Sequence, residues 1–169
     1  LHCPYTADKA RLVLREMAES LALDLVSKRL VTDQVVVTVG YDIENLTDPE
    51  RASHYNGLVV SDHYGRRIPK HAHGTERLET HTSSTKKIMG AATALFDRLV
   101  DPNLLIRRLN IVAGHVMPEN DAKKRNSGFE QLDLFGDYTA QKAKQEQEEA
   151  ELVRERKMQE TMLTIKRKY

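Results

Sequence analysis

Basic side chains gather in two short segments of this 169-residue chain. The first spans residues 65–78 and holds four cations, Arg66, Arg67, Lys70 and Arg77. The second is the pair Arg107 and Arg108. Guanidinium and ammonium groups bind phosphate oxygens through charge-assisted hydrogen bonds, so both segments are candidate contacts for a phosphate backbone. Ion pairing with Glu76 and Glu79 is the alternative use for these cations.

A second candidate binding element is a short apolar cluster set in polar sequence. It comprises Gln131, Leu132, Asp133, Leu134 and Phe135, and it follows a basic segment, residues 121–128, that is typical of a flexible tether. Exposed apolar side chains are unfavourable in water unless something covers them. We therefore expect either a docking motif for a partner or a linker end that folds back onto the domain.

Metal or nucleophilic chemistry has weaker support. His71 and His73, with His63 nearby, lack a second cluster of ligands, so contacts to solvent or phosphate are favoured over a metal site. Cys3 is the single cysteine, which excludes a disulfide within the chain and indicates a reducing compartment. No motif supports Cys3 as a nucleophile, and we expect an incidental buried thiol.

The composition indicates one domain with an appendage. Charged residues make up 30% of the chain and hydrophobic residues 40%, and the formal net charge is +1. That small net charge does not argue against a nucleic-acid partner, because the basic residues are clustered. No apolar run approaches the ~20 residues that a membrane span needs. The first residues have the pattern of the end of an element, so we expect a fragment of a longer protein.

Hydrophobic periodicity first predicts a helix and then a strand. Thr6 is the expected N-cap, and apolar residues recur at helical spacing as far as Leu25. A Val-rich strand is predicted from about Val35 to Tyr41. Its alternation places three valines on one face and Thr38 and Gly40 on the other. A face of such small residues can approach another surface closely, although a glycine can equally mark a bulge.

The next segments predict two further strands, a helix and a last strand. Residues 57–61 are a candidate hairpin strand, and residues 66–78 an irregular or edge strand because Pro69 and Gly74 interrupt them. An amphipathic helix follows a cap at residues 82–84. The best candidate for a second central strand is residues 104–113. There Leu109, Ile111 and Ala113 share the face suited to the core, while Arg108, Asn110 and Val112 face away.

This order predicts an α+β fold in which two helices cover one face of an antiparallel sheet. With a first strand that is missing or truncated at Leu1, the order is β-α-β-β-α-β. The uncovered face would carry Thr38, Gly40, Arg108 and Asn110 together with part of the basic segment. An open sheet face that is polar and basic is a candidate surface for phosphates.

The same succession of elements resembles the little-finger domain of Y-family translesion DNA polymerases, and the DinB/UmuC group of bacteria is the most similar. The most specific points are the segment Gly65-Arg66-Arg67-x-Pro69 and the strand Ile106-Arg107-Arg108-Leu109. The similarity covers residues 1–117. The apolar cluster at residues 131–135 resembles the motif by which bacterial polymerases and repair proteins dock onto the β sliding clamp.

The resemblance implies a DNA-repair fragment that grips double-stranded primer–template DNA and docks onto a bacterial β sliding clamp, in the cytoplasm near the nucleoid. The implied DNA contacts are Thr38, Gly40, Arg66, Arg67, Lys70, Arg77, Arg107 and Arg108. The implied clamp contacts are Gln131, Leu132, Asp133, Leu134 and Phe135. Three features depart from the family pattern, one of them the mixed-charge tail. Val112 faces outward where a polar residue is common, and the connection from Tyr41 to Tyr64 is long.

The polymerase family does its chemistry with metal-binding carboxylates on a palm domain. Asp24, Asp33 and Asp42 stand apart in the sequence and are expected to be solvated. We therefore predict no catalytic residue, cofactor or metal in this fragment, although the parent polymerase would use Mg.

Residues 1–118 are predicted to form the DNA-binding domain, residues 119–137 a linker with the clamp motif, and residues 138–169 a charged helical tail. The tail lacks a clean heptad, so a solvated helix that orders only in context is favoured over a coiled coil. The alternative for the whole chain is a non-enzymatic α+β regulatory or protein-interaction module that self-associates through this tail.

Overall fold

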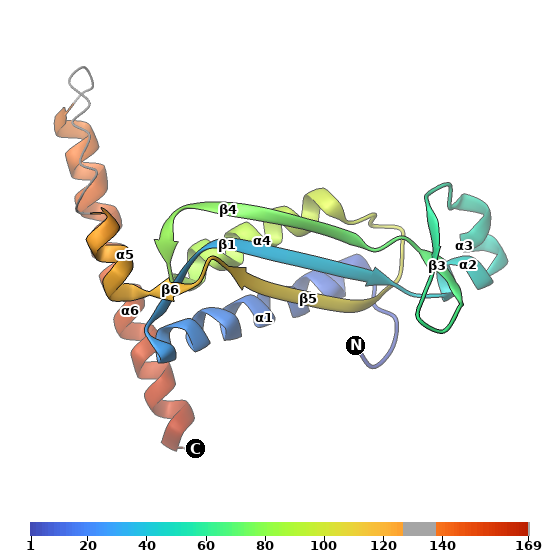
Figure 1. Ribbon diagram of the computed structural model, residues 1–169, viewed down its shortest axis with the longest axis horizontal. Coiled ribbons are helices and arrows are strands. Elements are labelled where there is room, and N and C mark those ends of the chain that lie inside the picture. Colours follow the sequence, from blue (N-terminus) through green and yellow to red (C-terminus); the bar gives the residue numbers. More distant parts are fainter. Residues whose placement is uncertain (127–137, 169) are drawn as a thin grey trace.

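An antiparallel sheet in the order β4–β1–β5 is the centre of the fold (Figure 1), in a computed structural model that describes residues 1–126 and 138–168. Strand β1 spans Leu30–Tyr41, β4 spans Ala72–Thr82 and β5 spans Ile106–Gly114. A two-residue strand, β6 (Met117–Pro118), pairs with the beginning of β1. The Val-rich segment that the sequence predicts as a strand is therefore the central strand, and it starts earlier than expected.

Two helices, α1 (Ala7–Lys28) and α4 (Thr85–Leu99), cover one face of this sheet (Figure 1). Between helices and sheet lies a core with fully buried side chains from both layers, among them Leu14, Val35, Val37, Val39, Ile88 and Leu95. Alternate residues of β1 are buried because side chains alternate between the two faces of a strand. The predicted α+β fold, with helices on one face and the other face open, is confirmed.

Strand β5 is not a second central strand. It pairs with β1 on one side, and on its other side the described chain makes a single bridge, Tyr5 to Ile106. Both backbone hydrogen bonds of that bridge measure 2.8 Å. Tyr5 thus occupies, beside β5, the position expected for the end of the first strand in the predicted β-α-β-β-α-β order.

The long connection after β1 folds into a lobe at one end of the sheet (Figure 1). It contains two short helices, α2 (Glu44–Thr47) and α3 (Pro49–His54), and a hairpin of β2 (Val59–Ser61) with β3 (Arg67–Pro69). The basic segment predicted as one irregular strand is therefore divided. Its first part belongs to the hairpin, and its second part is β4, an edge strand of the main sheet.

Asn45 ties this lobe to the sheet. Its side chain is completely buried, and its Nδ2 donates to the carbonyl oxygens of Asp42 (2.9 Å) and Leu105 (2.8 Å). The Leu105 N–H donates to Asn45 Oδ1 at 2.8 Å. The amide therefore satisfies three backbone groups at the corner where β1 ends and β5 is about to begin.

Helix α5 (Glu119–Asn126) corrects the expectation of a tether from residue 121. The segment is helical because Glu119 and Asp121 lie in its first turn, where carboxylates stabilise the helix dipole, and because Ala122 is buried. The Glu119 N–H also donates to the Arg29 carbonyl at 3.0 Å. The division of the chain at residues 118 and 137 remains a prediction.

Helix α6 (Tyr138–Lys168) is the predicted polar helix, but it is docked rather than solvated all round. Glu155 accepts hydrogen bonds from the Ser84 hydroxyl (2.6 Å) and the Lys86 N–H (2.8 Å), at the N-terminus of α4. Gln159, only 4% exposed, donates to the Ser83 carbonyl at 2.9 Å. The first turn of α4 has N–H groups without helical acceptors and a partial positive charge, which explains why a carboxylate from α6 binds there.

Candidate nucleic-acid interface

The open face of the sheet presents cross-strand rows of side chains. Gly40 lies opposite Arg108, and Thr38 lies between Asn110 on β5 and His73 on β4. Gln34, near the other end of β1, lies opposite Arg77. These positions follow from strand alternation, because the intervening residues of β1 point into the core.

The two arginines of β5 are placed by an irregularity in the sheet. Tyr41 pairs with Ile106 and Gly40 with Arg108, so Arg107 is an extra residue between two pairs. Its guanidinium donates to the His2 carbonyl at 3.1 Å, and its Nε lies 3.8 Å from Asp42 Oδ2. Arg107 and Arg108 consequently both reach the surface at this end of the sheet.

The absence of a side chain at Gly40 leaves space for the side chain of Arg108. A Cβ atom at residue 40 would lie 3.1 Å from the Arg108 Cβ, tighter than ordinary contacts. The sequence left open whether this glycine serves close approach or marks a bulge, and the structure shows both, since the register shift falls between Gly40 and Tyr41.

A hollow of about 920 Å³ lies between the β2–β3 hairpin and the open sheet face. Five of the eight predicted DNA contacts line it: Thr38, Gly40, Arg66, Arg107 and Arg108. Asn110 and His71 also belong to its wall. The structure thus brings together residues from β1, β5 and the hairpin that are far apart in sequence.

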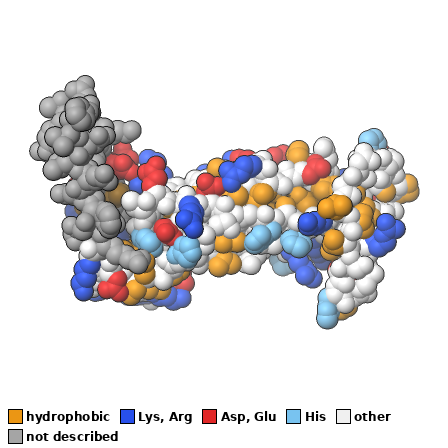
Figure 2. Space-filling view, turned by 45° about the horizontal axis from the view of Figure 1, so that its top comes forward, with side chains coloured by type: hydrophobic (Ala, Val, Ile, Leu, Met, Phe, Trp, Pro, Cys, Tyr) orange, Lys and Arg blue, Asp and Glu red, His pale blue; other side chains and the backbone are white. Residues whose placement is uncertain are grey.

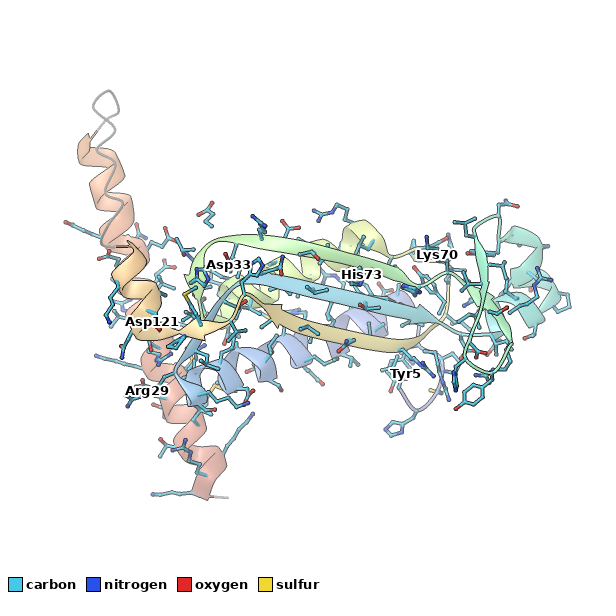
Figure 3. The ribbon with its side chains drawn as sticks, viewed as in Figure 1. Tyr5, Arg29, Asp33, Lys70, His73 and Asp121 are labelled. Atoms are coloured by element: carbon cyan, nitrogen blue, oxygen red, sulfur yellow. The ribbon has the colours of Figure 1, made fainter. Side chains whose placement is uncertain are left out.

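The other three predicted contacts lie outside this hollow. Arg67 is exposed on β3, and Lys70 is exposed in the connection to β4. Figure 3 shows Lys70 close to the lobe, with His73 further along β4 and Asp33 at the opposite end of the sheet. Arg77 pairs with Gln34, six positions along β1 from Gly40, which is roughly 20 Å at the rise of a strand. Figure 2 accordingly shows Lys and Arg side chains in separate groups on this side of the molecule.

Ion pairing involves two of these cations, Arg66 with Asp62 and, at the longer distance of 3.8 Å, Arg107 with Asp42. Arg66 NH2 lies 2.7 Å from Asp62 Oδ2. Their side-chain hydrogen bond lowers the pKa of Asp62 and raises that of Arg66. Glu76, one of the two predicted acidic partners, binds Arg98 at 2.6 Å instead. Within the described part of the chain, no ion pair occupies Arg67, Lys70, Arg77 or Arg108, which leaves these groups available to phosphates.

His73 is a polar member of this face, for which the sequence favoured contacts to solvent or phosphate over a metal site. Its Nδ1 lies 2.8 Å from the Thr38 hydroxyl. Thr38 and His73 meet because the register between β1 and β4 places them opposite each other, and this register cannot be read from the sequence of either strand. In residues 1–126 and 138–168, no three His, Cys, Asp or Glu side chains are arranged to hold a metal ion. Cys3 is exposed, so the expectation of a buried thiol is wrong.

The sequence profile of the impB/mucB/samB family C-terminal domain matches residues 3–134, which is most of the chain. The chain belongs to this family. No curated protein gives a significant match.

The family is that of the C-terminal domain of Y-family translesion DNA polymerases, and the matched region corresponds to the DNA-binding little finger. The resemblance to this polymerase family is therefore confirmed at that level. Helix α6 lies beyond the matched residues. Among the described helices of this little-finger domain, none is long and apolar enough to cross a bilayer.

The three aspartates considered from the sequence, Asp24, Asp33 and Asp42, do not form the Mg site of a polymerase. Asp24 pairs with Lys28 on α1 at 2.7 Å. Asp33 and Asp42 lie at opposite ends of β1, the former 3.0 Å from His115 and the latter accepting the Glu44 N–H at 2.9 Å. They do not converge, so no metal-dependent step is assigned to these residues.

The clamp motif, Gln131 to Phe135, lies outside the described residues. It remains a prediction from sequence, as does the alternative that this segment folds back onto the domain.

Proposed function

We propose that this chain is the non-catalytic DNA-holding part of a DinB/UmuC-type bacterial lesion-bypass polymerase. Family membership supports DNA as the partner, and one structural observation supports the mode of binding. Arg107 and Arg108 reach the surface beside Thr38 and Gly40, on the sheet face that α1 and α4 leave open. Cations beside small residues allow a phosphate backbone to approach the strands closely.

The grip would be independent of sequence. The side chains at the hollow offer hydrogen-bond donors and positive charge to phosphate oxygens, and such contacts position a duplex without reading its bases. An enzyme that must accept damaged templates needs this kind of hold. Thr38 and His73, which bind each other at 2.8 Å, offer polar atoms in the next row of the sheet.

The test is the salt dependence of duplex binding. Replacing Arg107 and Arg108 together by alanine should weaken binding and reduce the slope of log K against log salt by up to about two. The matched control removes the same charge from the helical side, with Lys9→Ala and Arg15→Ala, and should retain the slope. An unchanged slope in the arginine variant, or an equal loss in the control, contradicts the proposed surface.

We also propose that Leu132, Leu134 and Phe135 enter an apolar cleft of the β sliding clamp, with Gln131 hydrogen-bonding at its edge and Asp133 between the anchors. A few buried anchors commonly supply most of the binding energy of such short motifs. Calorimetric titration of the intact chain with a cognate β clamp should show binding that the variant Leu134→Ala, Phe135→Ala loses. The same variant should keep its duplex affinity, and the arginine variant should keep its clamp affinity.

A further inference from the structure

The tip of the β2–β3 hairpin presents an aromatic side chain that the proposed grip does not use. Tyr64 is 74% exposed. A ring of this size leaves a large apolar area in water, and it is not among the residues that form the hydrophobic core of the described chain. The hairpin itself projects beyond the end of the sheet (Figure 1).

The tip is held in one conformation. Asp62 Oδ1 accepts the N–H groups of Tyr64 and Arg66, both at 2.9 Å, and Asp62 Oδ2 accepts Arg66 Nε at 2.8 Å. The Gly65 N–H donates to the Asp62 carbonyl at 3.0 Å, with Gly65 at a φ of 76° that favours glycine. Tyr64 is therefore preorganised, which lowers the entropy lost when a ligand binds it.

The neighbours of the ring indicate what it would bind. The Arg66 guanidinium carbon lies over the ring, 5.2 Å from its centroid, and the His63 ring stands edge-on at 5.3 Å. Asp62 is the acidic residue of the tip, and it is engaged by Arg66, while Arg67 adds a further positive charge. An aromatic ring set among cations is the combination that stacks on bases and follows a phosphate backbone.

The hairpin also adjoins the proposed duplex surface. His63 and Arg66 line the same hollow as Arg107 and Arg108. A strand whose phosphates lie in that hollow would continue toward Tyr64. The bases inside a duplex have both faces covered, whereas an unpaired base beside the duplex leaves a face open to the ring.

We propose that Tyr64 stacks on an unpaired base of a single-stranded DNA extension next to the duplex held on the open sheet face. This inference rests on the proposed function. It assigns the β2–β3 hairpin to the single-stranded part of a primer–template and the sheet to its double-stranded part.

The test compares two DNA probes on the full chain. One is a blunt duplex, and the other is the same duplex with a short single-stranded extension carrying the fluorescent base 2-aminopurine. The unaltered chain should bind the extended DNA more tightly and quench the fluorescence of its 2-aminopurine. Tyr64→Ala should weaken binding of the extended DNA about tenfold and abolish the quenching, with blunt-duplex affinity unchanged. Tyr64→Phe should behave as the unaltered chain.

Four results would overturn the inference, the last of them together with the proposed function. Equal weakening of both DNAs by Tyr64→Ala would make the ring a structural or general contact. Full binding and quenching by Tyr64→Leu would show that no stacking ring is needed, as expected of an apolar contact to protein. In the third result, the unaltered chain binds the two probes equally well, while the combined Arg107→Ala and Arg108→Ala variant binds both more weakly. That result would exclude the stacking role of Tyr64 and leave the proposed function intact. Failure to bind either DNA would instead overturn both proposals.

Discussion

Asn45 has no part in the proposed interface, yet it positions the strand ends that form it. Its amide joins the end of β1 to Leu105, one residue before β5, and so fixes the place where Arg107 and Arg108 emerge. The residue lies in a polar stretch in which the sequence predicted only a connection. Nothing in its neighbours distinguishes a buried asparagine from an exposed one, because its three partners are backbone groups.

Replacing Asn45 by alanine should lower the free energy of unfolding by about 2–4 kcal/mol, because three hydrogen bonds are lost and the Leu105 N–H loses its acceptor, while the carbonyls of Asp42 and Leu105 keep one backbone donor each. The midpoint of urea unfolding measures this. Asn103→Ala is the matched control. Asn103 is exposed and bonds only within its own turn, so its loss should change stability by less than about 0.5 kcal/mol. Equal effects of the two substitutions would contradict the role given to Asn45.

At this scale the sequence predicted side-chain direction well and side-chain partners poorly. Strand alternation placed Thr38, Gly40 and Arg108 correctly on the open face, since a period of two needs no knowledge of the neighbouring strand. The partner of Arg66 was missed. Asp62 meets Arg66 only after residues 62–66 close the hairpin, and the sequence offered Glu76 and Glu79 as more visible choices.

Among the elements, the two core helices and the valine strand were predictable because each has a strong apolar period. The docking of α6 was not. The spacing of its carboxylates fits ion pairs within the helix equally well. In the structure, Glu151 instead forms an ion pair with Lys86, and Glu155 binds the N-terminus of α4. A contact between segments some 70 residues apart leaves no periodic signal in either segment.

Glu155→Ala should loosen the contact of α6 with the N-terminus of α4, at a cost of about 1–3 kcal/mol for a lost charge-assisted cap, while the bond from Gln159 to Ser83 remains. Hydrogen exchange of the α6 amides measures this loosening, which should appear as faster exchange around residue 155 with β1 still protected. Glu160→Ala serves as the control, since Glu160 pairs with Arg156 along the same helix. Unchanged exchange after Glu155→Ala would mean that the helix is held by other contacts.

The link between α1 and α4 predicts a pH dependence. Asp97 accepts both Nε (2.7 Å) and NH2 (2.8 Å) of Arg11, and this hydrogen bonding lowers the pKa of Asp97. A folded-state pKa below the unfolded value means that the ionised carboxylate stabilises the fold above about pH 3.9, and that this is lost as the pH falls through the folded pKa. Melting temperatures should therefore separate the native chain from Asp97→Asn at pH 7, and the difference should shrink progressively as the pH falls below about 4. A difference in melting temperature that stays constant with pH would contradict a stabilising contribution from the Arg11–Asp97 pair.

At the scale of the whole molecule, the sequence predicted the layer of helices on one side and an open polar face on the other. It predicted the hairpin strand at residues 57–61 but neither α2 nor α3, nor the lobe that these elements form with the hairpin, which turns a flat face into a hollow. Helices α2 and α3 are too short for periodicity to detect, with four and six residues. The position of the lobe against the sheet depends on Asn45 and on the irregular pairing at Arg107.

The central claim is that DNA lies on the open face of the sheet rather than on the helices. Methyl NMR of the intact chain during titration with a blunt duplex tests it most directly, because two exposed aliphatic side chains report on opposite sides. Val112 is 46% exposed on the open face, and Leu12 is 59% exposed on α1. The account predicts that the Val112 methyl signals shift as duplex is added while those of Leu12 do not. Shifts at Leu12 without shifts at Val112 would contradict it.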